Sequence, residues 1–180
     1  MNTKLLFTGA TGFLGSNLKT LLSNDFKVNT LGLTDEDDYK VNISTSIPEI
    51  DISHDVVLHA AGKAHMVPKT EIEKKDFFDV NFQGTVNLCK ALESSGVPKS
   101  FIFVSTVAVY GLEFGENITE EHPLNGDTPY ALSKIQAEEY LTDWCARNNV
   151  TLGIIRPSLI AGPNPPGNLG DMIRGIKTGK

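Results

Sequence analysis

Short apolar runs alternate with stretches of helical periodicity along the chain. The first run, Lys4–Thr8, is dominated by apolar residues, as expected of a strand buried in a parallel sheet. Similar runs cover residues 27–33, 55–59, 100–106 and 151–156, and helical spacing covers residues 17–22, 72–95, 129–145 and the segment from 171. This alternation predicts an α/β fold with a Rossmann-type doubly wound parallel sheet between two layers of helices. We expect the strand order 3-2-1-4-5, with residues 55–59 as the third strand.

A glycine-rich turn, GATGFLG at residues 9–15, joins the first strand to the first helix. Glycines let the backbone approach a pyrophosphate closely, and the free N–H groups of a helix N-terminus can bind it. The spacing is G-x-x-G-x-x-G rather than the G-x-G-x-x-G of the two-domain dehydrogenases. The strand–turn–helix context nevertheless favours a dinucleotide-binding turn over a tight turn that binds nothing.

The end of the second strand bears on the choice of dinucleotide. In such folds an acidic residue at this position binds the ribose hydroxyls and favours NAD. Here Gly32 takes that position, and the acidic residues 35–38 that follow could equally be a solvated loop. No Arg or Lys stands at the strand end to meet a 2′-phosphate, so we expect NAD and leave NADP open. Asn42 and Ile43 lie in a short extended segment where the adenine edge would be read.

Three small residues, Ala60, Ala61 and Gly62, follow the third strand at the edge where ligands bind in open parallel sheets. We interpret His59, at the end of that strand, as a structural histidine. His65, in the next loop, is either a solvated histidine or part of a sugar pocket.

The helix expected over residues 72–95 carries an apolar stripe with one polar interruption at Asn81. An amide in that place needs a hydrogen-bond partner, so Asn81 is either a satisfied core amide or one that reaches the active-site backbone or the cofactor. Gly84 within the same helix indicates close packing against a neighbouring element. The stripe consists of Phe78, Phe82, Thr85, Cys89 and Leu92.

The segment YALSK places Tyr130 and Lys134 four residues apart, and therefore on one helix face. A nearby cation stabilises phenolate and lowers the pKa of a tyrosine, which could then accept a proton from a sugar hydroxyl as hydride leaves its carbon. Thr106, or Ser105 beside it, would hydrogen-bond the same oxygen from the end of the fourth strand. The Y-x-x-x-K spacing is weak evidence alone, but it becomes strong after a glycine turn and a strand that ends Ser-Thr.

Composition excludes some classes of function. The 180 residues carry a formal net charge of −6, which argues against a nucleic-acid partner, and the apolar runs are too short to span a bilayer. Cys89 and Cys145 lack metal-ligand spacing and are interpreted as core thiols, so we expect no metal site. Since no disulfide is expected either, we expect a cytoplasmic location.

Taken in order, these motifs resemble the extended short-chain dehydrogenase/reductase superfamily, specifically its NAD-dependent epimerase/dehydratase group acting on nucleotide sugars. The matching segments are residues 8–15, 58–62, 81–88, 103–111, 129–134 and 156–163. The resemblance implies that Tyr130 is the acid/base, that Lys134 is its partner and a ribose ligand, and that Thr106 is the catalytic hydroxyl. The expected cofactor site comprises Gly9, Thr11, Gly12, Phe13, Leu14, Gly15, Asn42, Ile43, Ala60, Ala61, Gly62, Asn81, Ser105, Tyr130, Lys134 and Pro157.

Three departures from the family pattern limit that expectation. Val107 and Ala108 replace the acid pair of the sugar dehydratases, so 4,6-dehydration is not expected. Leu159 occupies the place of an Asn that often touches substrate. Family members run to roughly 300 residues or more with a C-terminal substrate domain, so we expect residues 1–180 to be the NAD(P)-binding domain of a longer protein and to be inactive alone.

The functional prediction is UDP-sugar 4-epimerase chemistry through a transient 4-keto sugar, with a nucleotide-sugar substrate and a homodimer through the helices bearing Asn81 and Tyr130. The alternative enzyme is an NAD(P)H-dependent nucleotide 4-keto-sugar reductase, which would release its cofactor at each turnover. A non-catalytic dinucleotide sensor is the alternative from another class, and the Tyr130–Lys134 pair argues against it.

Overall fold

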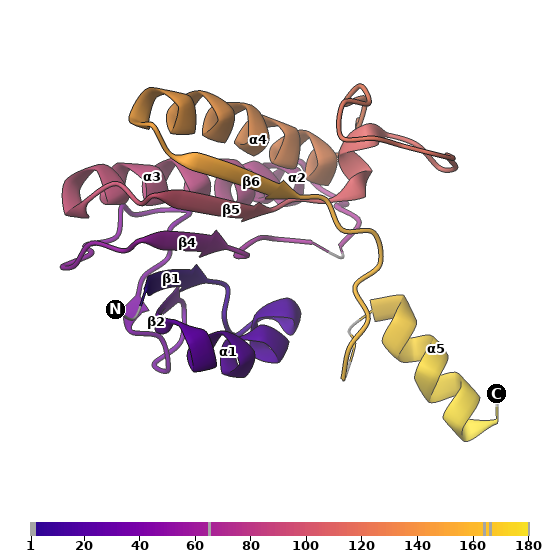
Figure 1. Cartoon of the computed structure of the whole chain (residues 1–180). Helices are drawn as coiled ribbons and strands as arrows, with labels where there is room; N and C mark the ends of the chain where they lie inside the picture. Colours follow the sequence, from indigo (N-terminus) through magenta and orange to yellow (C-terminus); the bar gives the residue numbers. More distant parts are fainter. Residues whose placement is uncertain (1–2, 65, 164, 166, 180) are drawn as a thin grey trace.

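The structure, a computed structural model, describes residues 3–64, 66–163, 165 and 167–179. Strands and helices alternate along the chain as the apolar pattern predicts (Figure 1). The elements are β1 (Lys4–Thr8), α1 (Phe13–Asp25), β2 (Lys27–Gly32), β3 (Tyr39–Lys40), β4 (Val56–His59), α2 (Glu71–Phe77), the π-helix η1 (Phe78–Gln83), α3 (Gly84–Ser95), β5 (Ser100–Val104), the 3-10 helix η2 (Val107–Tyr110), α4 (Pro129–Asn148), β6 (Thr151–Ile155) and α5 (Gly167–Thr178).

Six strands form one parallel sheet in the order β3-β2-β1-β4-β5-β6. The predicted parallel sheet is confirmed, and the order 3-2-1-4-5 holds when β3 is counted as the third strand, with β6, the predicted fifth strand, at the far edge. The edge strand beside β2 is β3, which is only two residues long and cannot be recognised in the apolar pattern. The prediction took residues 55–59 as the third strand and so placed them beside the second. That placement is wrong, because these residues contain β4, which pairs directly with β1.

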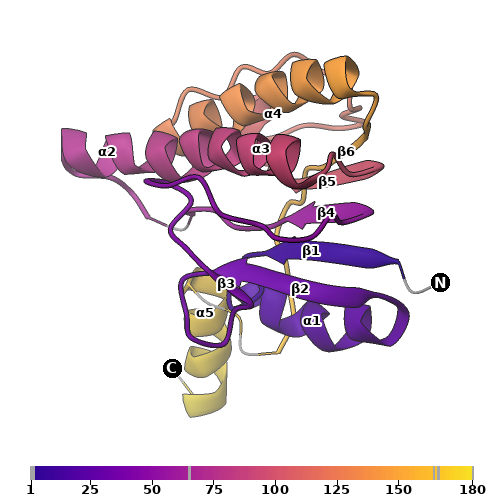
Figure 2. The ribbon, with the colours of Figure 1, turned by 90° about the vertical axis from the view of Figure 1, so that its left-hand side faces the viewer.

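Helices cover both faces of the sheet (Figures 1 and 2). α3 and α4 lie on one face, and α1 lies on the other. Successive residues of β1 point to opposite faces, so Leu6 packs in the core with Trp144 of α4, whereas Leu5 and Phe7 pack with Leu18 of α1. Burial of each such side chain contributes about 1.5–3 kcal/mol, which fixes the register and brings the carboxyl ends of the strands to one edge.

The helix predicted over residues 72–95 is present, but it is not continuously α-helical. The π-helix η1 separates α2 from α3 and shifts the buried stripe, so that Phe77 is fully buried and Phe78 only partly. A Cβ placed on Gly84 would lie 3.1 Å from Ile43 Cγ1, which confirms the predicted close packing. Short π segments inside helices are frequently found at functional sites.

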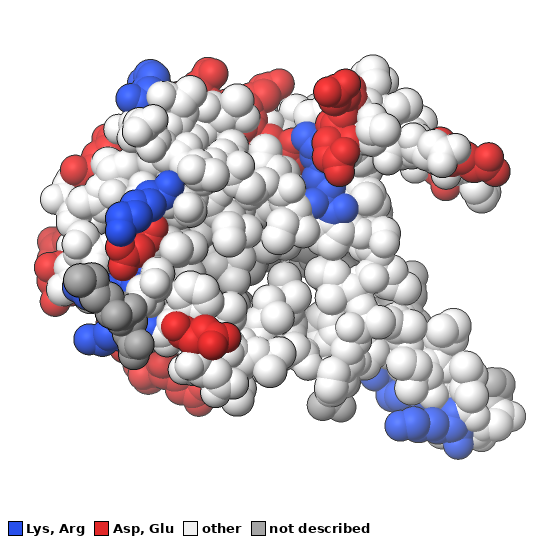
Figure 3. Space-filling view, in the orientation of Figure 1, with Lys and Arg blue, Asp and Glu red and all other residues white. Residues whose placement is uncertain are grey.

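α5 begins at Gly167, earlier than the predicted start at residue 171, and stands apart from the two helical layers (Figure 1). Figure 3 shows charged side chains scattered in small groups over this face, which is hollowed between the segment after η2 and α5. None of the helices in the described part of the chain is long and apolar enough to cross a membrane.

Candidate functional site

The carboxyl ends of β1, β4, β5 and β6 border a cavity of about 730 Å³. Its walls come from segments far apart in sequence: the glycine turn, the turn after β4, the end of β5, the first turns of α4 and the loop after β6. The crevice at the carboxyl edge of an open α/β sheet is where such folds bind ligands. It also contains Tyr130 and Lys134, which makes it the candidate site.

The glycine turn forms one wall of this cavity through its backbone. Gly9 has φ +76°, and a Cβ there would lie 2.6 Å from the backbone nitrogen of Ala61. A Cβ on Gly15 would lie 2.1 Å from Gly9 O, so Gly15 lets α1 pack against the turn. Gly12 is the N-cap of α1 with extended backbone (φ −72°, ψ 175°), and it offers no side chain to the first N–H groups of the helix. These groups can therefore bind an anion.

Tyr130 and Lys134 project from the first turns of α4, which begins at a favourable N-terminus. Thr128 is the N-cap, with its hydroxyl accepting a hydrogen bond from Ala131 N at 3.1 Å, and Pro129 occupies the first turn. Both functional side chains line the cavity beside Thr106, the residue that follows the end of β5 by two positions. The predicted catalytic residues are thus brought together.

Lys134 is held deep beneath the cavity. Its Nζ donates a hydrogen bond to Val104 O at 2.8 Å and lies 4.5 Å from the centroid of the Phe103 ring. A Cβ on Gly62 would lie 3.2 Å from this Nζ, so the small residue after β4 makes room for the ammonium group. Burial lowers the pKa of Lys134 to about 8, and the negative charge of Glu138 opposes that shift.

The pKa of Tyr130 differs from the sequence-based expectation. Burial raises it above the ordinary value, while a hydrogen bond with Thr106 acts in the opposite direction. Lys134 was expected to lower this pKa, but its ammonium group is directed to Val104 O. The residue spacing correctly placed the two groups on one helix face, whereas the direction of the pKa shift depends on burial that spacing does not reveal.

His59 is a structural histidine, as predicted. It is fully buried, and burial lowers its pKa to about 3. Thr85 donates its hydroxyl hydrogen to Asn81 O, so His59 Nε2 must donate to Thr85 Oγ1, at 2.9 Å. His59 Nδ1 therefore accepts from Thr8 Oγ1, which in turn accepts from Ala61 N. This chain of hydrogen bonds fixes a neutral tautomer and ties the turn after β4 to the π-helix.

Asn81, in the π-helix, reaches the backbone of a loop that lines the cavity. Its Oδ1 accepts from Lys63 N at 2.8 Å, and its Nδ2 donates to Lys63 O and to Ser133 Oγ. The amide is therefore satisfied in the core, and its partner Lys63 lines the candidate cavity. Its role is to hold Lys63 and α4 at a fixed separation.

At the end of β2, the acidic loop is not simply solvated. Asp37 is 8% exposed, and its Oδ2 accepts from the backbone and hydroxyl of Thr34. A Cβ on Gly32 would lie 2.4 Å from this Oδ2, so the Asp37 carboxylate occupies the space of the side chain that Gly32 lacks. Its Oδ1 is buried without a hydrogen-bond partner among the described residues.

Most of the predicted site residues line the cavity, but five do not. Asn42 is exposed and accepts from Ser44, and Ile43 is buried against Gly84. Ser105 lines the cavity, although its hydroxyl is donated to Glu138. His65 lies outside the described residues. The predicted residues in the lining are Gly9, Gly12, Phe13, Leu14, Gly15, Ala60, Gly62, Ser105, Thr106, Tyr130, Lys134 and Pro157, and those outside it are Thr11, Asn42, Ile43, Ala61 and Asn81.

Several lining residues were not predicted. Lys63 follows the small turn after β4 and could have been found from that position, because the turn itself was placed at the ligand edge. Others come from the loop after β6, where the sequence predicted only Pro157, and from the start of α5, which no local pattern marks for binding. They are Lys63, Ala64, Met66, Val67, Val104, Ser158, Leu159, Ile160, Gly167 and Leu169.

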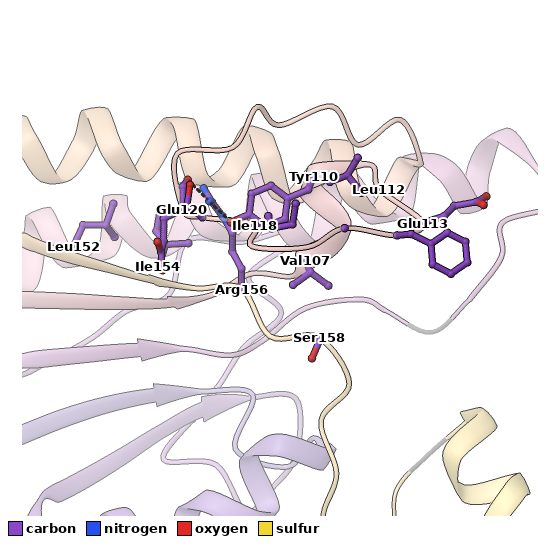
Figure 4. A pocket seen from close by; sticks show the side chains of 13 residues that line it. Val107, Tyr110, Leu112, Glu113, Ile118, Glu120, Leu152, Ile154, Arg156 and Ser158 are labelled. Carbon is purple, nitrogen blue, oxygen red and sulfur yellow. Dashed lines mark hydrogen bonds between the residues drawn. The ribbon is translucent and has the colours of Figure 1, made fainter.

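A second cavity, of about 760 Å³, lies between β6 and the segment after η2 (Figure 4). Leu152, Ile154 and Arg156 form its floor, and Tyr110 and Glu120 lie beyond the arginine. Neither the glycine turn nor the Tyr130–Lys134 pair belongs to its lining. The chemistry of the first cavity therefore makes it the better candidate.

Comparisons with known proteins agree with this geometry. The family model described as "NAD dependent epimerase/dehydratase family" matches residues 5–180. The chain is 36% identical to the N-acetyl-alpha-D-glucosaminyl-diphospho-ditrans,octacis-undecaprenol 4-epimerase of Escherichia coli O157:H7, over all of this chain and 56% of that protein. It is 34% identical to the UDP-glucose 4-epimerase of Vibrio cholerae, over 99% of this chain and 58% of that protein.

Solved structures give the same fold. The structure of RMD from Pseudomonas aeruginosa complexed with NADPH superposes with a TM-score of 0.79 at 26% identity, covering 98% of this chain and 63% of the other. This chain therefore spans little more than half the length of the curated relatives it matches. On the match over residues 5–180 and on these relatives, the chain belongs to the NAD-dependent epimerase/dehydratase family.

Proposed function

We propose that this chain is the cofactor-binding domain of an NAD-dependent nucleotide-sugar 4-epimerase. The observation that carries the proposal is one cavity that combines the glycine turn with Tyr130, Lys134 and Thr106. The site fits a dinucleotide, because Gly12 leaves the first N–H groups of α1 without a capping side chain and because a Cβ on Gly9 would fill the turn. Relatives solved with NAD or NADPH support this assignment.

NAD is the proposed cofactor rather than NADP. The carboxylate of Asp37 lies where the side chain of a strand-end residue would project, next to Gly32. An acidic group at this position accepts hydrogen bonds from ribose hydroxyls and repels a 2′-phosphate.

The residues of the chain have separate roles in the proposed reaction. Bound NAD would supply a hydride acceptor and a positive charge. Tyr130 takes the proton from the C4 hydroxyl of the sugar and later returns it, and Thr106 hydrogen-bonds the same oxygen. Lys134 would supply a hydrogen-bond donor for the ribose, and the hydrogen bond with Thr106 is what lowers the pKa of Tyr130. For epimerisation, the site would have to let the 4-keto sugar present either face of C4 to the bound cofactor while Tyr130 and Thr106 keep hold of the C4 oxygen.

The proposal is tested with the full-length protein, since the chain covers 56–58% of the length of two curated 4-epimerases that it matches. A 4-epimerase keeps one equivalent of NAD through purification and converts a UDP-sugar without net cofactor consumption. A 4-keto-sugar reductase consumes NADH or NADPH stoichiometrically and would replace this proposal. A dinucleotide sensor would keep its biological effect in a Tyr130→Phe variant.

The remaining assignments concern partners and compartment. We propose a homodimer through the helices that carry Asn81 and Tyr130, where Leu132 is 40% exposed on α4. Light scattering that reports monomer at high concentration would reject this. A cytoplasmic location is proposed because Cys89 and Cys145 are buried free thiols, as is usual in reducing compartments.

A further inference from the structure

One buried carboxylate in the molecule has no role in the reaction proposed above. Glu138 lies one helical turn after Lys134 on α4 and is 2% exposed. A buried carboxylate is costly unless it is paired and hydrogen-bonded, so its partners indicate what it does.

Glu138 gathers partners from two strand ends. Its Oε1 accepts the hydroxyl hydrogen of Ser105, the residue after β5. Arg156, the residue after β6, donates from Nε at 3.2 Å and from its terminal nitrogen to Oε2 at 2.6 Å. This bidentate pairing has strict geometry and is stronger than a single charged contact.

Lys134 and Glu138, one helical turn apart on α4, bind two consecutive residues at the end of β5. Lys134 Nζ donates to Val104 O, and Glu138 accepts from Ser105, so the helix is joined to this strand end by two adjacent hydrogen bonds. Thr106 follows immediately and lines the cavity. The position of the catalytic hydroxyl relative to Tyr130 therefore depends on Glu138.

Arg156 extends this network to the second cavity. A terminal nitrogen of Arg156 donates to the Tyr110 hydroxyl and to Glu120 O, both at 2.9 Å, and its guanidinium carbon lies 5.1 Å from the Tyr110 ring centroid (Figure 4). Pro157, directly after Arg156, lines the candidate site. The arginine thus fixes the start of the loop that forms one wall of that site.

We propose that Glu138 is a positioning residue for the Tyr130–Lys134 pair, holding the ends of β5 and β6 against α4 and keeping the Lys134 side chain charged. The part of this inference that concerns catalysis rests on the proposed function. The effect of Glu138 on the protonation of Lys134 can be measured without cofactor or substrate. The negative charge of Glu138 opposes the effect of burial on the Lys134 pKa. The other titratable or charged groups of this region are Tyr130 on α4, neutral His59 on β4 and Arg156 after β6.

The test is the titration of Lys134 in the chain as it stands, followed through the Cε signal of labelled lysine by NMR and assigned by its loss in Lys134→Met. The midpoint in the wild-type chain is expected near pH 8. In Glu138→Gln it should fall by about one pH unit, because an opposite charge is lost. In Arg156→Gln it should rise, since the carboxylate then no longer shares its charge with the arginine.

The Lys134 midpoint is expected to fall in one variant and to rise in the other. Disruption of the structure alone would not shift it in opposite directions. Glu139→Gln, an exposed neighbour on the same helix, is the matched control and should leave the midpoint unchanged. Should Glu138→Gln not fold, as judged by circular dichroism, the rise in Arg156→Gln remains the deciding result. An unchanged or raised midpoint in Glu138→Gln, or a lowered one in Arg156→Gln, would overturn the inference. Failure of NAD to bind the wild-type chain would instead count against the proposed function.

Discussion

The glycine turn and the start of α4 border the same cavity, but they contribute to it in different ways. The turn acts through backbone and through missing side chains, since a Cβ on Gly9 or Gly15 would overlap backbone atoms at 2.6 and 2.1 Å. The α4 region acts through buried charge, with Lys134 at 4% and Glu138 at 2% exposure. One wall therefore depends on backbone shape, and the other on buried charges and their partners.

This difference indicates how each wall responds to mutation. A backbone site has little or no room for added atoms, yet its chemistry does not depend on pH. A buried charge tolerates small changes of shape, but it is sensitive to protonation and to the loss of any partner.

The largest effect is expected for Tyr130→Phe in the complete enzyme. The ring packing, which includes Phe77 at a centroid distance of 6.0 Å, is kept, and only the phenol oxygen, the proposed proton carrier, is lost. Turnover should fall by about 10²–10⁴-fold with little change in cofactor affinity. Steady-state kinetics and NAD titration check this, and near-wild-type turnover would remove Tyr130 from the acid/base role.

Lys134→Met should change the pH dependence of stability. The pKa of Lys134 is lowered from 10.5 to about 8 in the folded protein, so between these values the unfolded chain binds more protons. Stability of the wild-type chain should therefore rise with pH across this window relative to Lys134→Met, by about 3 kcal/mol in all. Urea unfolding at intervals from pH 7.5 to 10 measures the difference; parallel curves for the two proteins would contradict the buried charge.

Gly12→Val should weaken NAD binding while the chain stays folded. Gly12 has an ordinary φ of −72°, and its added Cβ would lie 3.3 Å from Gly9 O, a contact that a small shift relieves. The branched side chain would displace the pyrophosphate from N–H groups whose charged hydrogen bonds contribute about 1.5–3 kcal/mol each, so affinity should drop about 100-fold. Calorimetry provides the affinity. Gly15→Val is the contrasting variant, because its Cβ would overlap backbone and should unfold the chain.

The smallest effect is expected at the end of β2. Asp37→Ala should reduce the preference for NAD over NADP by about tenfold, the loss of roughly one hydrogen bond to a charged group. The double variant Gly32→Asp with Asp37→Ala, which returns a carboxylate to the strand end, should restore the preference. Equal discrimination in wild type and Asp37→Ala would show that the carboxylate does not select the cofactor.

Sequence patterns predicted the parts of the molecule that are determined locally. The strand–turn–helix around residues 9–15 and the placing of Tyr130 and Lys134 on one helix face both follow from residues close together in sequence. Both are present in the structure. Packing between distant segments determines three features that the sequence did not predict. They are the π-helix, the two-residue β3 and the position of the Asp37 carboxylate beside Gly32. The ion pair of Glu138 with Arg156 joins residues 18 apart on different elements, so no local spacing marks it.

The most direct test of the account is an NMR titration of the isotope-labelled chain with NAD. If one dinucleotide lies along the cavity, the backbone N–H signals of residues 12–15 and the Lys134 side-chain signal should shift together on a single saturation curve. Shifts confined to one of these two regions, or different affinities for the two, would contradict a shared cofactor site.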